Sequence, residues 1–330
     1  MDSPPDLIAI GDTVVDEFIL LKDAAIHCNI NRENCEICLR FADKVPFEAA
    51  YLLPAVGNSA NAAVAAARLG LRSALVTNLG ADGYGEDCLR ALRANGVETG
   101  FAQVHADHKT NHHYVLWYED DRTILIKHEK YPYRLPDLGS PQWLYLSSLG
   151  ENSVEFHRAI ADYLNAHPTV KLAFQPGTFQ IKMGAAALAP IYERAAVFFC
   201  NKEEAQRILA TAEEDVKKLI GQLNLLGPKI VVVTDGKEGA YVLADGAYWF
   251  MPSYPDPQPP FERTGAGDAF SSTFTAALAY GLPIPEALRW APINSMSVVQ
   301  YVGAQEGLLT KAKLTGYLAA APADYAPRRI

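Results

Sequence analysis

The residues best suited to chemistry lie in a short glycine-rich turn near the end of the chain. The turn reads Thr264-Gly265-Ala266-Gly267-Asp268, and the segment after it has the apolar spacing of an amphipathic helix. Consecutive backbone N–H groups at the start of a helix form a natural binding site for an anion. Asp268 would repel a bound phosphate, but it could take the proton from a hydroxyl that attacks the phosphate. The turn therefore indicates phosphoryl transfer with Asp268 as the base. The alternative is that Asp268 only stabilises the helix N-terminus through the helix dipole.

Two common nucleotide-binding motifs do not explain this turn. A dinucleotide-binding fingerprint needs a third glycine, an early strand–helix–strand unit and an acidic residue about 20 positions later. The turn lacks these features, which argues against an oxidoreductase. The sequence also contains no Gly-x-x-x-x-Gly-Lys-Ser/Thr motif, which excludes a P-loop nucleotide site.

The elements that must position this turn form an alternating α/β pattern. β-rich apolar runs predict strands, and amphipathic segments between most of them predict helices. Strands that are apolar throughout and alternate with helices indicate a mainly parallel sheet covered on both faces. The predicted strands are 7–10, 74–79, 143–147, 171–174, 196–200 and 230–234, and the predicted helices are 59–69, 85–94, 154–164, 202–209, 214–225 and 268–280.

Two segments, 14–53 and 101–130, interrupt this alternation. In the second segment, residues 113–118 alternate in period two, turn at 119–121 and return over 123–128, which predicts a β-hairpin. Together the two segments could form a small second sheet beside the carboxyl ends of the main strands, where open α/β sheets bind ligands. We favour a lid over the active site, and the alternative is a structural or dimer-forming addition.

The composition is that of an ordinary globular chain. Of the 330 residues, 49% are hydrophobic and 20% charged, and the net charge of −9 argues against a surface for nucleic acid or anionic lipid. Apolar stretches are far shorter than the roughly 20 residues of a membrane span, and the acidic N-terminus does not resemble a signal peptide. Five cysteines do not make a disulfide framework. We therefore expect a cytoplasmic enzyme with a single domain over residues 1–330.

Five motifs follow one another along nearly the whole chain. They are residues 11–16, 57–61 with the following 62–70 and 78–85, 201–204, 234–239 and 264–270. Together they resemble the motifs of the ribokinase-like (PfkB) carbohydrate kinase family. The resemblance implies a ribokinase-like three-layer α/β/α fold, with a mainly parallel central sheet and a small β-sheet lid. It also implies ATP-dependent phosphorylation of an alcohol group, usually on a sugar or a nucleoside.

Several site residues follow from the resemblance. Asp268 corresponds to the catalytic base, and the anion hole that stabilises the transferring phosphoryl group corresponds to Gly265, Ala266 and Gly267. The substrate-binding residues would be Asp16, Gly57, Asn58 and Asn61. Asp16 would accept hydrogen bonds from substrate hydroxyls, whereas Asn61 taken alone could equally be a helix-capping residue.

The resemblance also implies binding sites for ATP and Mg²⁺. Glu204 would act near the phosphates through metal-bound water, since Mg²⁺ keeps several waters in protein sites. Taken alone, Glu204 could instead be an exposed acid in the first turn of a helix, and Asn294 a helix-surface amide. The ATP-binding residues would be Asn201, Glu204, Thr234, Gly236, Gly239 and Asn294.

Some positions depart from the family pattern. Val14 stands where sugar kinases often have a polar residue, and Val56 and Asn58 flank Gly57 where ribokinases have a Gly-Gly-Lys turn. These changes argue against ribose as the substrate but leave the reaction type unchanged. Glu262 and Gly307 alter the loop that binds a monovalent cation in potassium-activated members, so potassium activation is an open alternative.

Two polar clusters in the lid segments allow more than one interpretation. Ligand types suited to tetrahedral zinc occur at His27, Cys28, Cys35 and Cys38. A reversible disulfide is one alternative, and partly buried thiols are the interpretation that we favour. A wall that favours an acidic or phosphorylated sugar could be formed by His112, His113, Lys127, His128 and Lys130. For this second cluster we favour a solvated strand face.

The favoured hypothesis is an ATP-dependent sugar kinase whose lid excludes water before transfer. A nucleoside kinase of the same fold is the alternative, in which Val14 with Tyr114 or Trp117 would accept a nucleobase. A non-catalytic sugar- or nucleotide-binding module is the hypothesis from another class. Lid strands often leave sheet edges to be paired, so we also expect a homodimer through the lid.

Overall fold

Eleven strands form the main sheet of the computed structural model, which describes residues 4–22, 24–28, 35–118 and 121–330. These strands are β1 (Leu7–Ile10), β6 (Ser73–Gly80), β7 (Val97–Glu98), β8 (Ala102–His105), β11 (Trp143–Leu146), β12 (Lys171–Phe174), β13 (Ala195–Asn201), β14 (Ile230–Thr234), β15 (Ala240–Ala244), β16 (Ala247–Met251) and β17 (Arg328–Arg329).

The strand order is β17-β16-β15-β14-β13-β12-β11-β1-β6-β7, and β8 also pairs with β6. All pairings from β14 to β6 are parallel, as are those of β6 with β7 and β8. The strands β15, β16 and β17 add an antiparallel edge. The mainly parallel sheet expected from the apolar strand pattern is therefore confirmed. One difference is that β8, which lies within the lid segment 101–130 of the sequence, belongs to the main sheet.

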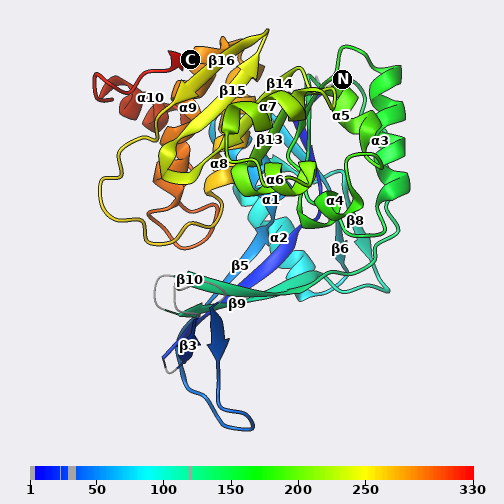
Figure 1. Cartoon of the computed structure of the whole chain (residues 1–330). Coiled ribbons are helices and arrows are strands. Elements are labelled where there is room, and N and C mark those ends of the chain that lie inside the picture. Colours follow the sequence, from blue (N-terminus) through cyan, green and yellow to red (C-terminus); the bar gives the residue numbers. More distant parts are fainter. Residues whose placement is uncertain (1–3, 23, 29–34, 119–120) are drawn as a thin grey trace.

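Helices cover both faces of this sheet (Figure 1). Successive residues of each strand point to opposite faces, and both faces carry apolar side chains that the helices bury. Leu7 and Ala9 of β1 pack into one core, whereas Ile8 and Ile10 pack into the other. The first core includes α1 (Asn58–Arg68), α2 (Gly83–Ala94), α8 (Ala266–Ala279), α9 (Ile284–Val298) and α10 (Lys311–Ala319). The second core includes α3 (Val154–Ala166), α5 (Ala189–Arg194), α6 (Lys202–Leu209) and α7 (Val216–Asn224), and the short α4 (Thr178–Met183) follows β12. These layers make the predicted three-layer α/β/α fold.

A separate sheet of four strands projects from one end of the main body (Figure 1). Its order is β10-β9-β2-β5, and its strands are β2 (Val14–Leu21), β5 (Phe47–Val56), β9 (Asn111–Tyr118) and β10 (Asp121–Lys127). The central pair β2 and β9 is parallel, and the outer pairings are antiparallel. We call these four strands the lid. The small second sheet expected from the two interrupting segments is present, and its inner face looks toward the main body.

A two-stranded hairpin lies at the far end of the lid (Figure 1). It consists of β3 (Ala25–His27) and β4 (Glu36–Cys38), and a disulfide joins Cys28 to Cys35. The favoured interpretation of free thiols is therefore wrong for these two residues, although Cys38 is free. The disulfide also removes two of the thiolates that the zinc alternative needed.

None of the helices in the described ranges has the length and apolar character that a bilayer crossing requires.

Candidate active site

A cavity of about 670 Å³ lies between the main sheet and the lid. Five parallel strands, β1, β11, β12, β13 and β14, point their carboxyl ends at it, which is the ligand-binding edge of an open α/β sheet. The lining residues at or just beyond these ends are Asp12, Ser148, Gln175, Asn201 and Thr234. The lid contributes the opposite wall through Val14, Asp16, His113, Arg122, Ile124 and Ile126.

The predicted glycine-rich turn opens into this cavity. Gly265 is the N-cap of α8 with φ +79°, and a Cβ built on it would lie 2.3 Å from the Ala304 Cβ, so only glycine fits there. No side chain of the described residues caps this helix terminus. Ala266 N lies 3.5 Å from the Arg263 carbonyl oxygen, and the other N–H groups of this terminus are available to an anion in the cavity. Gly265 and Gly267 line the cavity, whereas Ala266 is not among the lining residues.

Asp268 lies in the first turn of α8 and faces the cavity, although its side chain is mostly buried. Its carboxylate accepts three hydrogen bonds from neutral amides. The Nδ2 atom of Asn58 lies 2.9 Å from Oδ1, Nε2 of Gln175 lies 2.9 Å from the same oxygen, and Nδ2 of Asn61 lies 2.8 Å from Oδ2. Burial raises the pKa of Asp268, and the three donors partly oppose that shift. The arrangement gives a fixed and poorly solvated carboxylate that faces the cavity.

Gln175 is held in the orientation that presents its amide N–H to Asp268. The Tyr145 hydroxyl donates to Gln175 Oε1, so that Nε2 points toward Asp268. The Ser271 hydroxyl lies 3.1 Å from the same Oε1 and 2.6 Å from the Gly267 carbonyl oxygen. Burial and the nearby Asp268 raise the pKa of Tyr145, which keeps this phenol protonated as a donor. Gln175 was missed by the sequence reasoning. It directly follows the predicted strand 171–174, so the rule that strand ends carry function could have found it.

The four predicted substrate residues all line the cavity, but two of them contact Asp268. The amides of Asn58 and Asn61 donate to Asp268, and Asn61 Oδ1 accepts from Gln305 Nε2 at 2.9 Å. Gly57 has φ +110°, and a Cβ there would lie 2.8 Å from the Asp12 carbonyl oxygen. Asp16 stands on the lid wall. Asn58 and Asn61 therefore connect the strand–helix turn at Gly57 to Asp268.

The residues predicted for ATP divide into two groups. Asn201, Glu204 and Thr234 line the cavity, whereas Gly236, Gly239 and Asn294 are not among its lining residues. Asn201 and Glu204 form a reciprocal cap at the start of α6, in which each side chain accepts from the other's backbone N–H. Burial raises the pKa of Glu204, and this acid is not the exposed side chain of the alternative interpretation.

Asn294 is also not a helix-surface amide. It is fully buried, where its Nδ2 donates to Thr273 Oγ1 at 2.8 Å and its Oδ1 accepts from Leu309 N at 2.9 Å. Asn294 thereby ties α9 to α8 and to the segment before α10.

The two positions singled out in the predicted cation loop contribute to backbone contacts. One oxygen of Glu262 accepts from Thr264 N at 3.0 Å, and the other accepts from Gly303 N at 2.8 Å. The carbonyl of Gly307 accepts from Ser297 Oγ at 2.7 Å. Glu262 therefore connects the segment before the glycine-rich turn 264–268 with the loop at 303–305.

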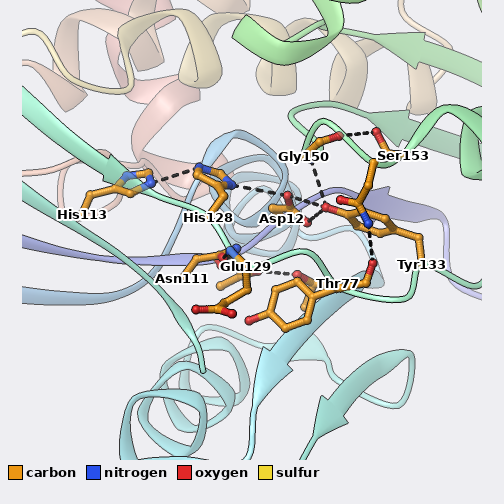
Figure 2. A network of polar contacts seen from close by, with 12 residues as sticks. Asp12, Thr77, Asn111, His113, His128, Glu129, Tyr133, Gly150 and Ser153 are labelled. Atoms are coloured by element: carbon orange, nitrogen blue, oxygen red, sulfur yellow. Dashed lines mark hydrogen bonds and ion pairs between the residues drawn. The ribbon is translucent and has the colours of Figure 1, made fainter. Parts of the chain in front are cut away.

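A second polar cluster lies on the lid side of the cavity (Figure 2). Figure 2 shows His128 between His113 and Asp12, with Tyr133 beyond Asp12. Both histidines line the cavity, so the favoured interpretation of a solvated strand face is wrong for them. It holds for Lys127 and Lys130, which are exposed.

His112 points to the outer face of the lid, where its Nε2 lies 3.2 Å from Glu17 Oε2. The period-two pattern of β9 places neighbouring side chains on opposite faces, but it does not say which face meets the cavity.

Comparisons with known proteins agree with one another. A sequence model of the pfkB family of carbohydrate kinases matches residues 24–311. A ribokinase of Bacillus subtilis is 30% identical over 270 residues, which cover 77% of this chain and 84% of the relative. A nucleoside kinase of Methanothermobacter thermautotrophicus is 24% identical over 256 residues, which cover 76% of this chain and 80% of the relative.

Solved structures share the fold. The structure of Arabidopsis thaliana ribokinase complexed with ribose and ATP has a TM-score of 0.79, with 19% identity over 96% of this chain and 99% of that one. The nucleoside kinase of Methanocaldococcus jannaschii has a TM-score of 0.76, with 16% identity over 97% of this chain and 100% of that one.

Proposed function

The chain belongs to the pfkB family of carbohydrate kinases, and we propose that it is an ATP-dependent sugar kinase in which Asp268 is the general base. The family makes it a phosphotransferase with an alcohol group as acceptor, which excludes the hypothesis of a non-catalytic binding module. One observation carries the proposal. The Asp268 carboxylate and the uncapped N-terminus of α8 face the same cavity, so a hydroxyl and a phosphoryl group can meet there.

The residues of this chain divide the chemistry between them. The acceptor hydroxyl donates its proton to Asp268, whose orientation is fixed by the amides of Asn58, Asn61 and Gln175. The backbone N–H groups of Gly265, Ala266 and Gly267 stabilise the negative charge of the transferring group. The lid excludes water from this step, because water that reached the phosphoryl group would hydrolyse ATP.

The cavity fits a magnesium–nucleotide on the side opposite the lid. An uncapped helix N-terminus suits phosphate, and the carboxylate of Glu204 suits a hard cation that keeps water ligands. ATP with Mg²⁺ supplies the phosphoryl group and neutralises its charge. We assign ATP binding to Asn201, Glu204 and Thr234, which line the cavity, and to Gly236 and Gly239 in the turn after Thr234. We place Mg²⁺ at Glu204 through water. Asn294 is fully buried, so the role predicted for it is limited to the packing of α9 and it is assigned no contact with ATP.

A nucleoside kinase is the second candidate, and one observation favours it. Val14, Ile124, Ile126 and Phe179 give the cavity an apolar side that could receive a base. The two aromatic residues expected from the sequence for this role are not among the lining residues. Tyr114 is exposed on the outer face of the lid, and Trp117 contacts Phe261.

The substrate is identified by ADP release from ATP and Mg²⁺ across hexoses, pentoses, keto-sugar acids and nucleosides. Turnover of sugars without turnover of nucleosides supports the sugar kinase, and the reverse result selects the nucleoside kinase. The same assay in K⁺ and in Na⁺ buffers tests potassium activation. The cytoplasmic location expected from the sequence stays a prediction.

The role of Asp268 is tested by Asp268→Asn. We expect kcat to fall about 100-fold or more, the usual scale for a general base, while the Kd of ATP changes little. Asp245→Asn is the matched control, because Asp245 is exposed in the turn between β15 and β16. Near-normal turnover by Asp268→Asn would show that another group accepts the proton.

A further inference from the structure

Two histidines and an aspartate gather on the loop that leads from the main sheet into the lid. His105 is the last residue of β8, and Asp107 and His108 follow it before β9 begins at Asn111. One ring nitrogen of each histidine and one carboxylate oxygen of Asp107 lie within 4.8 Å of one another. No other three His, Cys, Asp or Glu side chains in the described ranges bring ligand atoms this close together. We call these three residues the loop triad.

His105 is held in the tautomer that a metal ion requires. Its Nε2 lies 2.9 Å from Oδ1 of Asn78, a buried residue of the neighbouring strand β6. An amide oxygen only accepts hydrogen bonds, so Nε2 carries the proton and Nδ1 keeps its lone pair. Histidines that bind a metal usually donate their other ring N–H in this way, and the bond fixes the direction of the ring. Asn78 therefore prepares His105 as a nitrogen ligand.

His108 and Asp107 share a position for a positive charge. His108 Nδ1 lies 2.8 Å from Asp107 Oδ1, so a proton must lie between the nitrogen and the carboxylate. A metal ion can take the place of this proton, because imidazole nitrogen and carboxylate oxygen are both metal ligands once deprotonated. The exposed fractions of the two side chains are 21% for His108 and 83% for Asp107. An ion in solution can therefore reach both ligands.

The scaffold holds the two imidazole rings close to each other. Their centroids are 5.4 Å apart, and the buried ring of Tyr131 packs 5.3 Å from His105 and 5.4 Å from His108. The Tyr131 hydroxyl donates to the Lys109 carbonyl at 2.6 Å. The Ala81 N–H donates to the His105 carbonyl at 2.9 Å. The two rings are thereby placed before an ion binds, which lowers the cost of binding.

The ligand types select a class of metal ion. Imidazole suits transition-metal ions such as Zn²⁺, Ni²⁺ and Cu²⁺, whereas Mg²⁺ prefers oxygen ligands. Bonds from Zn²⁺ to nitrogen and oxygen are about 2.1 Å long, so the ligand atoms of a tetrahedral site lie about 3.4 Å apart. The solvent-accessible side chains of Asp107 and His108 can move by the remaining distance. Three protein ligands leave the fourth position to water.

We propose that the loop triad is a binding site for one divalent transition-metal ion, separate from the Mg²⁺ of the proposed ATP site. None of its members lines the active-site cavity. Because His105 ends a strand of the main sheet and His108 lies on the path to the lid, a bound ion ties this connection together. The inference goes beyond the proposed kinase function. Its tests measure metal binding and not ADP release, so a failure of either proposal leaves the other standing.

The first experiment measures Zn²⁺ binding by titration calorimetry. The full chain is used without an affinity tag, after removal of metal with EDTA. The parent protein carries Cys28→Ser, Cys35→Ser and Cys38→Ser, so that thiols of the β3–β4 hairpin cannot bind the ion. We expect one Zn²⁺ per chain with a Kd on the order of 1 µM. A parent protein that binds no Zn²⁺ overturns the inference.

Single substitutions in this parent test each ligand. We expect His105→Gln, His108→Gln and Asp107→Asn each to raise the Kd of Zn²⁺ at least about 10-fold, since each removes or weakens one ligand. The exposed position of Asp107 keeps its result independent of folding. His167→Gln is the matched control, because this histidine is also partly exposed and stacks on a tyrosine, Tyr163, at 4.2 Å. Binding that is unchanged in His105→Gln and Asp107→Asn overturns the inference.

Two further readouts separate a built site from weak binding at the surface. Zn²⁺ should raise the Tm of the parent protein but not that of His105→Gln, because an ion stabilises the state to which it binds. A millimolar excess of Mg²⁺ should not displace Zn²⁺, since the two nitrogen ligands disfavour it. An equal rise of Tm in both proteins, or displacement of Zn²⁺ by Mg²⁺, would contradict the proposed site.

Discussion

At the scale of single residues, the surroundings of Asp268 decide how it can act as a base. Three neutral amides hold the carboxylate, and burial raises its pKa above the ordinary value of an aspartate. A carboxylate accepts a proton only when it is ionised. Activity should therefore fall as the pH drops through the raised pKa of Asp268, and the three amides set where this acidic limb lies.

Gln175→Leu tests this reasoning. The amide of Gln175 lowers the pKa of Asp268, so its removal should raise that pKa further and move the acidic limb of kcat toward neutral pH. We also expect kcat at neutral pH to fall about 10-fold, because a buried charged acceptor loses one donor. The measurement is kcat against pH under saturating ATP and sugar.

The matched control for this change is Gln142→Leu, at an exposed glutamine whose amide donates to the Ala279 carbonyl. Its pH profile should superimpose on that of the unmodified enzyme. If Gln175→Leu loses activity equally at every pH, Gln175 supports the fold and does not tune the base.

At the scale of elements, two contacts join the lid to the loops beside the catalytic turn. The Trp117 ring of β9 meets Phe261 edge-on with centroids 5.2 Å apart. Leu53 of β5 packs so closely on Gly303 that a Cβ there would lie 2.3 Å from Leu53 Cδ1. Glu262 bonds both loops together, since it accepts from Thr264 N and Gly303 N. The lid is thereby coupled to the segment that carries Asp268.

Phe261→Ala should weaken this lid contact. Loss of one aromatic pair shifts the balance between closed and open lid by about 3- to 10-fold. A lid that opens more often admits water, so we expect ATP hydrolysis without sugar to rise relative to sugar phosphorylation. Both rates are followed by ADP release. Phe41→Ala is the control, because Phe41 is fully exposed before β5. An unchanged ratio in Phe261→Ala would mean that this contact does not hold the lid.

Elements with local signals could be predicted from the sequence. Helix α6 lies at the predicted 202–209, because Asn201 and Glu204 form their cap within four residues. Strands β9 and β10 follow from period-two alternation around an acidic turn. The apolar run of β1 and the glycine after it located the first strand. In each case the residues that determine the element are neighbours in the chain.

The side-chain arrangement of the site could not be predicted in the same way. Asp12 and His128 lie side by side although they are 116 positions apart in the sequence. Gln175, which directly follows β12, donates to Asp268 in helix α8. Such contacts depend on the register in which the strands pair and on how the two sheets are placed, and no local sequence pattern specifies either of these. Register also decides that His113, opposite Ile126, faces the cavity while His112 faces outward. The disulfide between Cys28 and Cys35 was weighed as an alternative but not favoured, because spacing does not fix the pairing state of cysteines.

At the scale of the whole molecule, exposed apolar surface is concentrated on the lid and on the neighbouring β3–β4 hairpin with the segment that follows it. Of the seventeen large apolar side chains exposed in the described ranges, ten lie within residues 26–52 and 114–126. Strand register places Leu52, Tyr114 and Leu125 in one row across the outer face, and all three are exposed. The edge strands β5 and β10 also have unpaired sides. Exposed apolar faces and open edges favour association, and a second copy of the chain is the partner that we predict.

The dimer prediction is tested by light scattering coupled to size-exclusion chromatography. We expect the unmodified protein to elute at twice the chain mass of 36.0 kDa, and Leu125→Glu to shift it toward the monomer because a charge would be buried in the interface. Leu225→Glu is the matched control, since Leu225 is exposed on the main body just after α7. A monomeric unmodified protein, or a dimer that survives Leu125→Glu and dissociates with Leu225→Glu, would contradict association through the lid.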